Sequence, residues 1–145
     1  MRFVSLLMRI VLGAVFIYSG WSKLLSPVEN FIAVIQGYQF LKPPFISPTA
    51  FILPWLELTL GSFLVLGFLT RFSASVLGIF LLMFIGLLAR SILLHLPVSE
   101  CGCFGSGIVL APWQAVILDS GLLAVSFILV RRGNALWSLD GFLRR

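Results

Sequence analysis

The chain has 145 residues, of which 60% are hydrophobic and only 10% are charged, and its mean hydropathy is +1.12. A soluble domain carries about 25% charged residues because its surface faces water, so this composition excludes a water-soluble globule and a disordered tail. The net charge of +5 does not indicate a nucleic-acid-binding module, because the ten basic residues lie between apolar runs and form no cluster. The composition is that of an integral membrane protein.

Four apolar segments are long enough to cross a bilayer as helices, which takes about 20 residues each. We expect a single transmembrane domain over residues 1–145 that folds as an all-α four-helix bundle. Its spans are predicted at about 3–25, 51–69, 72–94 and 112–130. The first segment follows Arg2 as a secretion signal would, but it lacks an Ala-x-Ala cleavage site and continues into Lys23. It is therefore predicted to be a retained span.

Positive charges near the span ends predict the orientation. With both termini in the cytoplasm, seven basic residues lie inside and three outside, the three being Lys23, Lys42 and Arg90. The opposite orientation inverts that ratio and is disfavoured. We expect a multi-pass protein of the inner (cytoplasmic) membrane, with loops 26–50 and 95–111 facing the periplasm, where disulfides form and persist.

The first outer loop is predicted to contain a short amphipathic helix. The segment Ser26–Glu29 has the pattern of an N-cap, a proline at the first helical position and a capping-box carboxylate. Apolar residues at helical spacing follow it. We expect Pro43 and Pro44 to end this helix, which would lie in the outer interface and cover the bundle.

The second outer loop contains both cysteines of the chain, in the motif Cys101-Gly102-Cys103-Phe104-Gly105. Cysteines this close bridge only in a tight turn, which the glycines permit. Such a small ring is strained and adds little stability, and strained disulfides are typically labile or catalytic. We therefore expect Cys101 and Cys103 to form a redox pair. Two alternatives stay open: thiols with no role beyond a local staple, and a copper-binding thiolate site.

Charged residues inside the predicted spans are functional candidates, because a charge in a bilayer is costly. At 1.5 Å of rise per residue, Glu57, Arg90 and Asp119 fall within about 6–11 Å of the level of the cysteine loop. In one interpretation, Arg90 or Lys23 stabilises a cysteine thiolate and a carboxylate relays its proton. In the other, these charges pair between helices and fix the register of the bundle, and the partner of Arg90 stays open. Arg9 is expected to extend to the inner interface.

Aromatic residues gather at the outer level of the predicted bundle. Trp21, Trp55, Phe104 and Trp113 fit the interfacial belt of a membrane protein. Together with Lys23, the same residues are candidates for a slot that binds the flat ring of a quinone cofactor.

Three segments resemble a known family. They are GAVFIYSGWSKL at 13–24, PWLEL at 54–58 and CGCFG at 101–105. In this order and spacing they are similar to the MauE/DoxX group of small four-helix membrane proteins, and the cysteine motif resembles its MauE branch. The resemblance covers nearly the whole chain.

The resemblance implies a membrane component of periplasmic thiol and disulfide metabolism. The role named for the MauE branch is maturation of methylamine dehydrogenase, whose small subunit is rich in disulfides, and the DoxX branch includes a subunit of a thiosulfate:quinone oxidoreductase. By this analogy Cys101 and Cys103 are the redox pair, with Glu57 and Asp119 as matching acids in the membrane. The bundle also resembles the quinone-linked disulfide-forming enzymes, but the chain has a Cys-x-Cys pair and no second pair. A single pair can still exchange directly with a thioredoxin-like domain.

The sequence thus favours a thiol–disulfide oxidoreductase, or the membrane half of one. Its partners would be a periplasmic thioredoxin-like protein or a disulfide-rich client, with membrane quinone as a cofactor. The competing hypotheses are a non-enzymatic assembly or anchoring subunit of a larger membrane complex, and a copper-handling protein.

Overall fold

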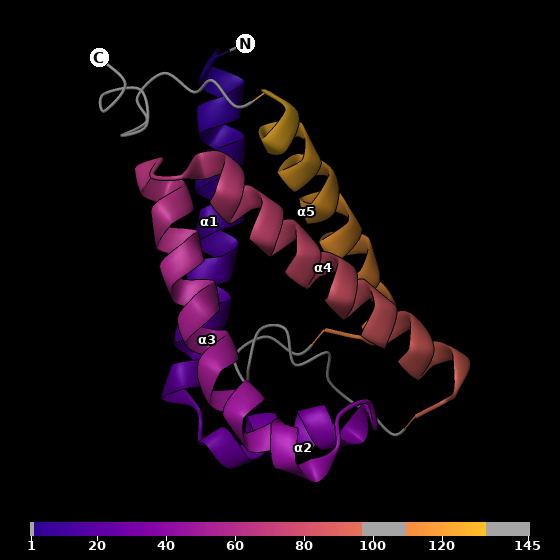
Figure 1. Ribbon diagram of the computed structural model, residues 1–145. Coiled ribbons are helices and arrows are strands. Elements are labelled where there is room, and N and C mark those ends of the chain that lie inside the picture. Colours follow the sequence, from indigo (N-terminus) through magenta and orange to yellow (C-terminus); the bar gives the residue numbers. More distant parts are fainter. Residues whose placement is uncertain (1, 97–109, 133–145) are drawn as a thin grey trace.

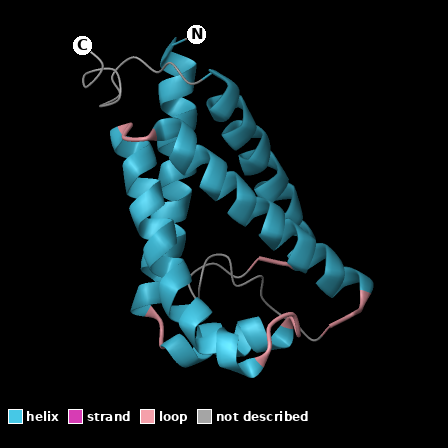
Figure 2. Ribbon diagram, in the orientation of Figure 1, coloured by secondary structure: helices cyan, strands magenta, loops and turns pink. Residues whose placement is uncertain are grey.

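The computed structural model describes residues 2–96 and 110–132, and every element in this part of the chain is a helix (Figures 1 and 2). The helices are α1 (Arg2–Leu25), α2 (Val28–Gly37), α3 (Pro43–Leu66), α4 (Thr70–Leu93) and α5 (Pro112–Arg132). All except α2 are long and apolar enough to cross a membrane. The predicted all-α membrane bundle, with a short helix between its first two spans, is confirmed.

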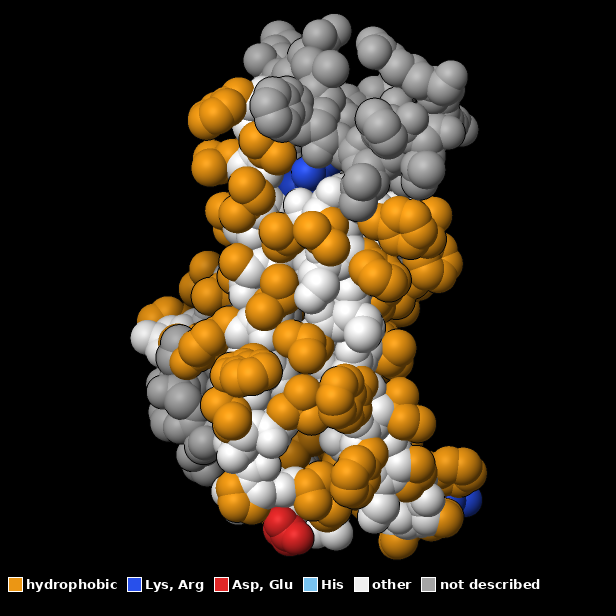
Figure 3. Space-filling view, turned by 90° about the vertical axis from the view of Figure 1, so that its left-hand side faces the viewer, with side chains coloured by type: hydrophobic (Ala, Val, Ile, Leu, Met, Phe, Trp, Pro, Cys, Tyr) orange, Lys and Arg blue, Asp and Glu red, His pale blue; other side chains and the backbone are white. Residues whose placement is uncertain are grey.

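The outer surface of the bundle is apolar along the length of the helices. Large side chains such as Phe51, Ile79 and Ile117 are more than 60% exposed. On the face shown in Figure 3, hydrophobic side chains cover the middle, and the charged ones that are coloured lie near the two ends. Since exposed apolar surface of this extent is unfavourable in water, the surface is suited to contact with lipid.

Helices α1 and α3 pack closely because glycines line their contact. A Cβ built on Gly13 would lie 2.8 Å from the carbonyl oxygen of Gly61, and one on Gly20 would lie 2.7 Å from that of Pro54. Small residues at such positions allow two membrane helices to bring their backbones together. The close approach fixes which side chains of α1 face α3.

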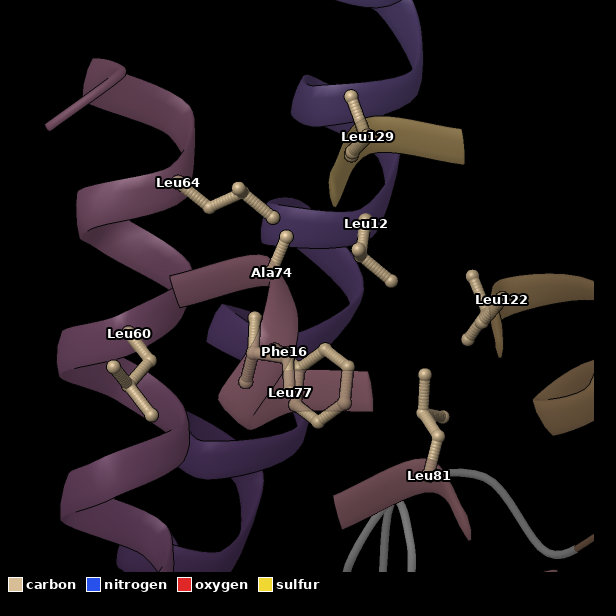
Figure 4. Close-up of a cluster of buried hydrophobic side chains, with 9 residues drawn as sticks. All are labelled: Leu12, Phe16, Leu60, Leu64, Ala74, Leu77, Leu81, Leu122 and Leu129. Carbon is tan, nitrogen blue, oxygen red and sulfur yellow. The ribbon is translucent and has the colours of Figure 1, made fainter. Parts of the chain in front are cut away.

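Helices α4 and α5 form the second closely packed pair. Ser126 Oγ on α5 donates a hydrogen bond of 2.7 Å to the carbonyl oxygen of Ala74, and the absence of a side chain at Gly78 makes room for Ser126. A shared apolar core joins the two pairs (Figure 4). Its buried members are Leu12, Phe16, Leu60, Leu64, Ala74, Leu77, Leu81, Leu122 and Leu129.

The second spanning helix begins earlier than the sequence predicted, at Pro43 and not at 51. Pro43 and Pro44 start α3, whereas the sequence assigned them to the end of the preceding helix. The physical reason is that the first helical positions have no intrahelical partner for their N–H groups, so proline loses no hydrogen bond there. Helix α2 already ends at Gly37.

The predicted start of α2 is also corrected. Its N-cap is Pro27, with no side-chain cap hydrogen bond, and Ser26 Oγ donates to the carbonyl oxygen of Ser22 at 2.9 Å. The Ser26 hydroxyl therefore extends the hydrogen bonding at the end of α1 and does not cap α2. Glu29 still lies in the first turn, where a negative charge favours the helix dipole.

The turn between α3 and α4 is held by Arg9, which was expected to reach the inner interface. Its side chain is only 1% exposed, and Nη2 donates to the carbonyl oxygen of Val65 at 3.3 Å. Gly67 ends α3 with φ of 74°, and a Cβ there would lie 2.8–2.9 Å from the guanidinium atoms. A cation at a helix C-terminus is favourable because the last carbonyls carry partial negative charge.

Candidate functional site

The centre of the candidate site is a buried ion pair between α1 and α3. Lys23 Nζ lies 2.8 Å from both carboxylate oxygens of Glu57, and both side chains are 0% exposed. Ser19 joins them, since its Oγ donates to Glu57 Oε2 at 3.0 Å and accepts from Lys23 Nζ at 3.0 Å. Buried charges are tolerated when they are paired and hydrogen-bonded, and both conditions are met here.

The local sequence explains why these three residues meet. Ser19 and Lys23 are four residues apart in α1, so they lie on one face of the helix. Gly20 lies between them, and a Cβ at this position would come within 3.0 Å of the backbone of Leu58 and 3.3 Å of the Glu57 Cβ. Because Gly20 has no side chain, α1 lies close enough to α3 for the Glu57 carboxylate to reach both Ser19 and Lys23.

Aromatic rings from two further helices enclose the ion pair. Lys23 Nζ lies 5.2 Å from the ring centre of Phe31 on α2 and 5.4 Å from that of Phe84 on α4. A cation over an aromatic face is attracted by the ring quadrupole. Helix α2 thus covers the bundle at the level of Lys23, and water is kept away from the pair.

Asp119 on α5 is a second buried carboxylate, and it lines a small pocket together with Ser19. Its side chain is 3% exposed. This pocket, of about 20 Å³, is also lined by Phe84 and Leu122. The site therefore combines ionisable groups from α1, α3 and α5.

Arg90 does not join this cluster. It is exposed near the end of α4, and within the described ranges it forms no ion pair with Glu57 or Asp119. The partner of Glu57 is Lys23 instead, which the sequence placed among the candidates for stabilising a thiolate or binding quinone.

The three tryptophans proposed to line a quinone slot lie on the surface. Trp21, Trp55 and Trp113 are 56%, 57% and 60% exposed, respectively. A larger apolar cavity, of about 220 Å³, lies elsewhere, between α2, α3 and α4. Its lining is Phe31, Val34, Ile35, Tyr38, Phe40, Leu41, Thr49, Leu53, Met83, Phe84 and Leu87.

Sequence reasoning missed Ser19, Phe31 and Phe84 as members of the site. Ser19 carried a usable signal, because it lies four residues before a lysine inside the same span. Phe31 and Phe84 carried no such signal, because the sequence contains many phenylalanines in apolar segments and nothing distinguishes these two from the others.

Cys101, Cys103 and Phe104 lie outside the described residues. The chain on either side of them is described, and Leu110 packs in the same cluster as Tyr38, at the α2 end of the bundle. Cys101 follows Leu96 by five residues, a reach of at most about 18 Å. The described residue that follows this segment, Leu110, thus lies at the end of the bundle where α2 lies (Figure 1). Among the described residues, no group of three metal-ligating side chains occurs.

Residues 1–132 match the family described as Methylamine utilisation protein MauE. No curated protein and no solved structure matches the chain significantly.

Proposed function

This chain belongs to the MauE family of membrane proteins, and we propose that it serves methylamine utilisation as a membrane component of thiol–disulfide redox metabolism. In this proposal Cys101 and Cys103 cycle between dithiol and disulfide in exchange with a periplasmic thioredoxin-like protein or a disulfide-rich client. The observation that carries the proposal is the buried ion pair of Lys23 and Glu57, which lies beside α2, at the end of the bundle where Leu110, just after the cysteine segment, also packs.

The exchange follows ordinary thiol chemistry. A thiolate attacks one sulfur of the partner's disulfide, so that a mixed disulfide forms and one partner sulfur leaves as thiolate. The second cysteine then attacks the mixed disulfide, which yields the Cys101–Cys103 bridge and the fully reduced partner. The two protons of the original thiols pass to the two thiolates that leave the partner, so the exchange is neutral in protons overall. The same steps in reverse transfer a disulfide to a client, with quinone in the membrane as the proposed oxidant of the pair.

The contacts of the described residues support a different role for each charged side chain. Lys23 is fully engaged by Glu57 and Ser19, so its charge is already compensated. Arg90 is exposed on α4, the helix that leads into the cysteine loop. We therefore assign the stabilisation of a cysteine thiolate to Arg90, and the handling of protons to the buried carboxylates Glu57 and Asp119.

Serine substitutions at the cysteines test this function. We expect Cys101→Ser and Cys103→Ser, singly and together, to abolish maturation of the disulfide-rich client while the free energy of unfolding stays unchanged. Ser106→Ala in the same loop serves as the matched control. A fully active double variant would contradict redox cycling and favour an assembly or anchoring subunit. Stoichiometric Cu(I) that disappears with the cysteines would favour copper handling.

A further inference from the structure

Helices α3 and α4 diverge from their connecting turn toward the end of the bundle where α2 lies (Figure 1), and a cavity of about 220 Å³ lies between these three helices. Its lining includes Phe31 and Phe84, the two rings that lie 5.2 Å and 5.4 Å from Lys23 Nζ. It also includes Tyr38, which packs in the same cluster as Leu110, the first described residue after the cysteine segment. The cavity therefore shares walls with the buried ion pair and with the place where the chain returns to the bundle after the cysteines.

The lining of this cavity selects an uncharged, apolar ligand. None of the described residues that line it carries a charge, and four of them are aromatic. Among them only Tyr38 and Thr49 have a polar side-chain group, and Thr49 Oγ1 donates to the carbonyl oxygen of Phe45 at 2.7 Å. Because burying a charge without a partner is costly, an ionised molecule does not fit this lining.

The volume of the cavity corresponds to one substituted ring. An apolar cavity of about 150 Å³ lined by Leu, Ile and Phe stays dry and holds one benzene molecule. At about 220 Å³, the cavity between α2, α3 and α4 has room for one ring with small substituents. Its aromatic walls favour a flat ligand over a hydrocarbon chain, because aromatic rings gain additional energy from offset or edge-to-face contacts with one another.

The cavity is accessible from the surface of the bundle that is suited to lipid. Two of its lining residues, Phe40 and Met83, are 59% and 38% exposed. A molecule dissolved in the bilayer can therefore enter between α4 and the connection of α2 to α3. Its hydrocarbon tail can stay in the lipid while its ring lies against Phe31 and Phe84.

We propose that this cavity binds the ring of a membrane quinone. The identity of the ring rests on the proposed function, in which a lipid-soluble quinone oxidises the cysteine pair. In that step the thiols of Cys101 and Cys103 form one sulfur–sulfur bond. The two electrons and two protons that the thiols give up convert the two carbonyl groups of the quinone into hydroxyls. The part played by the described residues is to hold the ring beside Tyr38 and Phe84 and to keep charged molecules out.

Photolabelling of the protein in lipid vesicles tests this site. The probe is an azido-benzoquinone with a short alkyl tail, and the labelled residues are identified by mass spectrometry. We expect label on lining residues of α2 and α4, Tyr38 and Leu87 among them, and its displacement by the same quinone without the azide. Displaceable label on the exposed Trp21, Trp55 and Trp113 in place of these residues would overturn the assignment.

Two leucines of α4 provide matched variants. Leu87 lines the cavity, whereas Leu82 is 57% exposed and is not among the lining residues. Leu87→Trp should reduce the displaceable label by about tenfold or more, because a ring that is kept out loses its apolar burial. Leu82→Trp should leave the label unchanged. If Leu87→Trp fails to fold, Val34→Leu adds a methylene to the α2 wall and should also reduce the label. Undiminished label in the variant that folds would contradict the site.

The same experiment separates this inference from the redox proposal. With both cysteines replaced by serine, the label should stay in the cavity, because binding of the ring uses neither thiol. A cysteine pair that responds to quinone while the label lies elsewhere would overturn the site alone. A photoactivatable phospholipid chain that labels Tyr38 and Leu87 and is not displaced by quinone would mean that the cavity holds lipid, and it would overturn the site as well.

Discussion

Replacing Lys23 by methionine should destabilise the bundle strongly. The substitution keeps the length of the side chain, but it leaves the Glu57 carboxylate, which is 0% exposed, with Ser19 as its remaining hydrogen-bond partner among the described residues. Breaking a buried ion pair by removing one partner costs about 3–5 kcal/mol, because the other charge stays buried without compensation. We expect a loss of this size, and a similar loss for Glu57→Met, which leaves the Lys23 ammonium between Phe31 and Phe84.

The double variant Lys23→Met/Glu57→Met distinguishes an ion-pair effect from a packing effect. Replacement of both charges by apolar side chains of similar volume is often neutral or stabilising. The double variant should therefore be more stable than either single variant, with a coupling energy of several kcal/mol, about 3 or more. Lys42→Met is the control, because Lys42 is exposed and surface substitutions usually stay within about 0.5 kcal/mol.

The assay is reversible unfolding in mixed detergent micelles, followed by circular dichroism as the denaturing detergent is increased. Two results would refute the reasoning: a loss below about 1 kcal/mol for Lys23→Met, or single losses that simply add in the double variant. Either would mean that the two charges are not buried against each other.

Three further substitutions test the packing and the site. Gly61→Ala places a Cβ 2.9 Å from the carbonyl oxygen of Gly13 and should cost about 1–3 kcal/mol of unfolding free energy. Gly86→Ala is the control and should cost nothing, because nothing lies within 4 Å of its Cβ. Equal losses in the two variants would contradict the close α1–α3 contact. Gly67→Ala should cost at least about 1–2 kcal/mol in the same assay, because φ is 74° and Arg9 fills the space; an unchanged stability would be inconsistent with this turn. Arg90→Gln should leave stability within about 0.5 kcal/mol but slow alkylation of the cysteines at neutral pH, and an unchanged alkylation rate would remove Arg90 from the site.

The sequence was informative about what lies in the membrane and less so about which residues meet there. Length and hydropathy were enough to predict the four spans, because the bilayer imposes both. The start of α3 was placed too late, because prolines were interpreted as helix breakers although Pro43 and Pro44 occupy the first helical positions. Pro48 and Pro54 also lie inside this helix.

The partners of the buried charges were beyond prediction because pairing depends on how each helix is rotated about its axis. Glu57 and Asp119 were recognised as costly residues in apolar spans, but the pairing interpretation considered Arg90 as the cation, with its partner left open, and assigned Lys23 elsewhere. The rotation of α1 is set by Gly13 and Gly20, whose contacts with α3 turn Lys23 inward. Spacing along a single chain does not contain this information.

The redox behaviour of the Cys101–Cys103 pair tests the central claim most directly. Membranes containing the protein would be equilibrated with defined thiol buffers, with and without quinone, and the free thiols counted by mass labelling. We predict a bridge that titrates reversibly, with a potential well above about −300 mV, below which structural disulfides usually lie, and that becomes more oxidised when quinone is added. A pair that stays in one state in every buffer would contradict the claim.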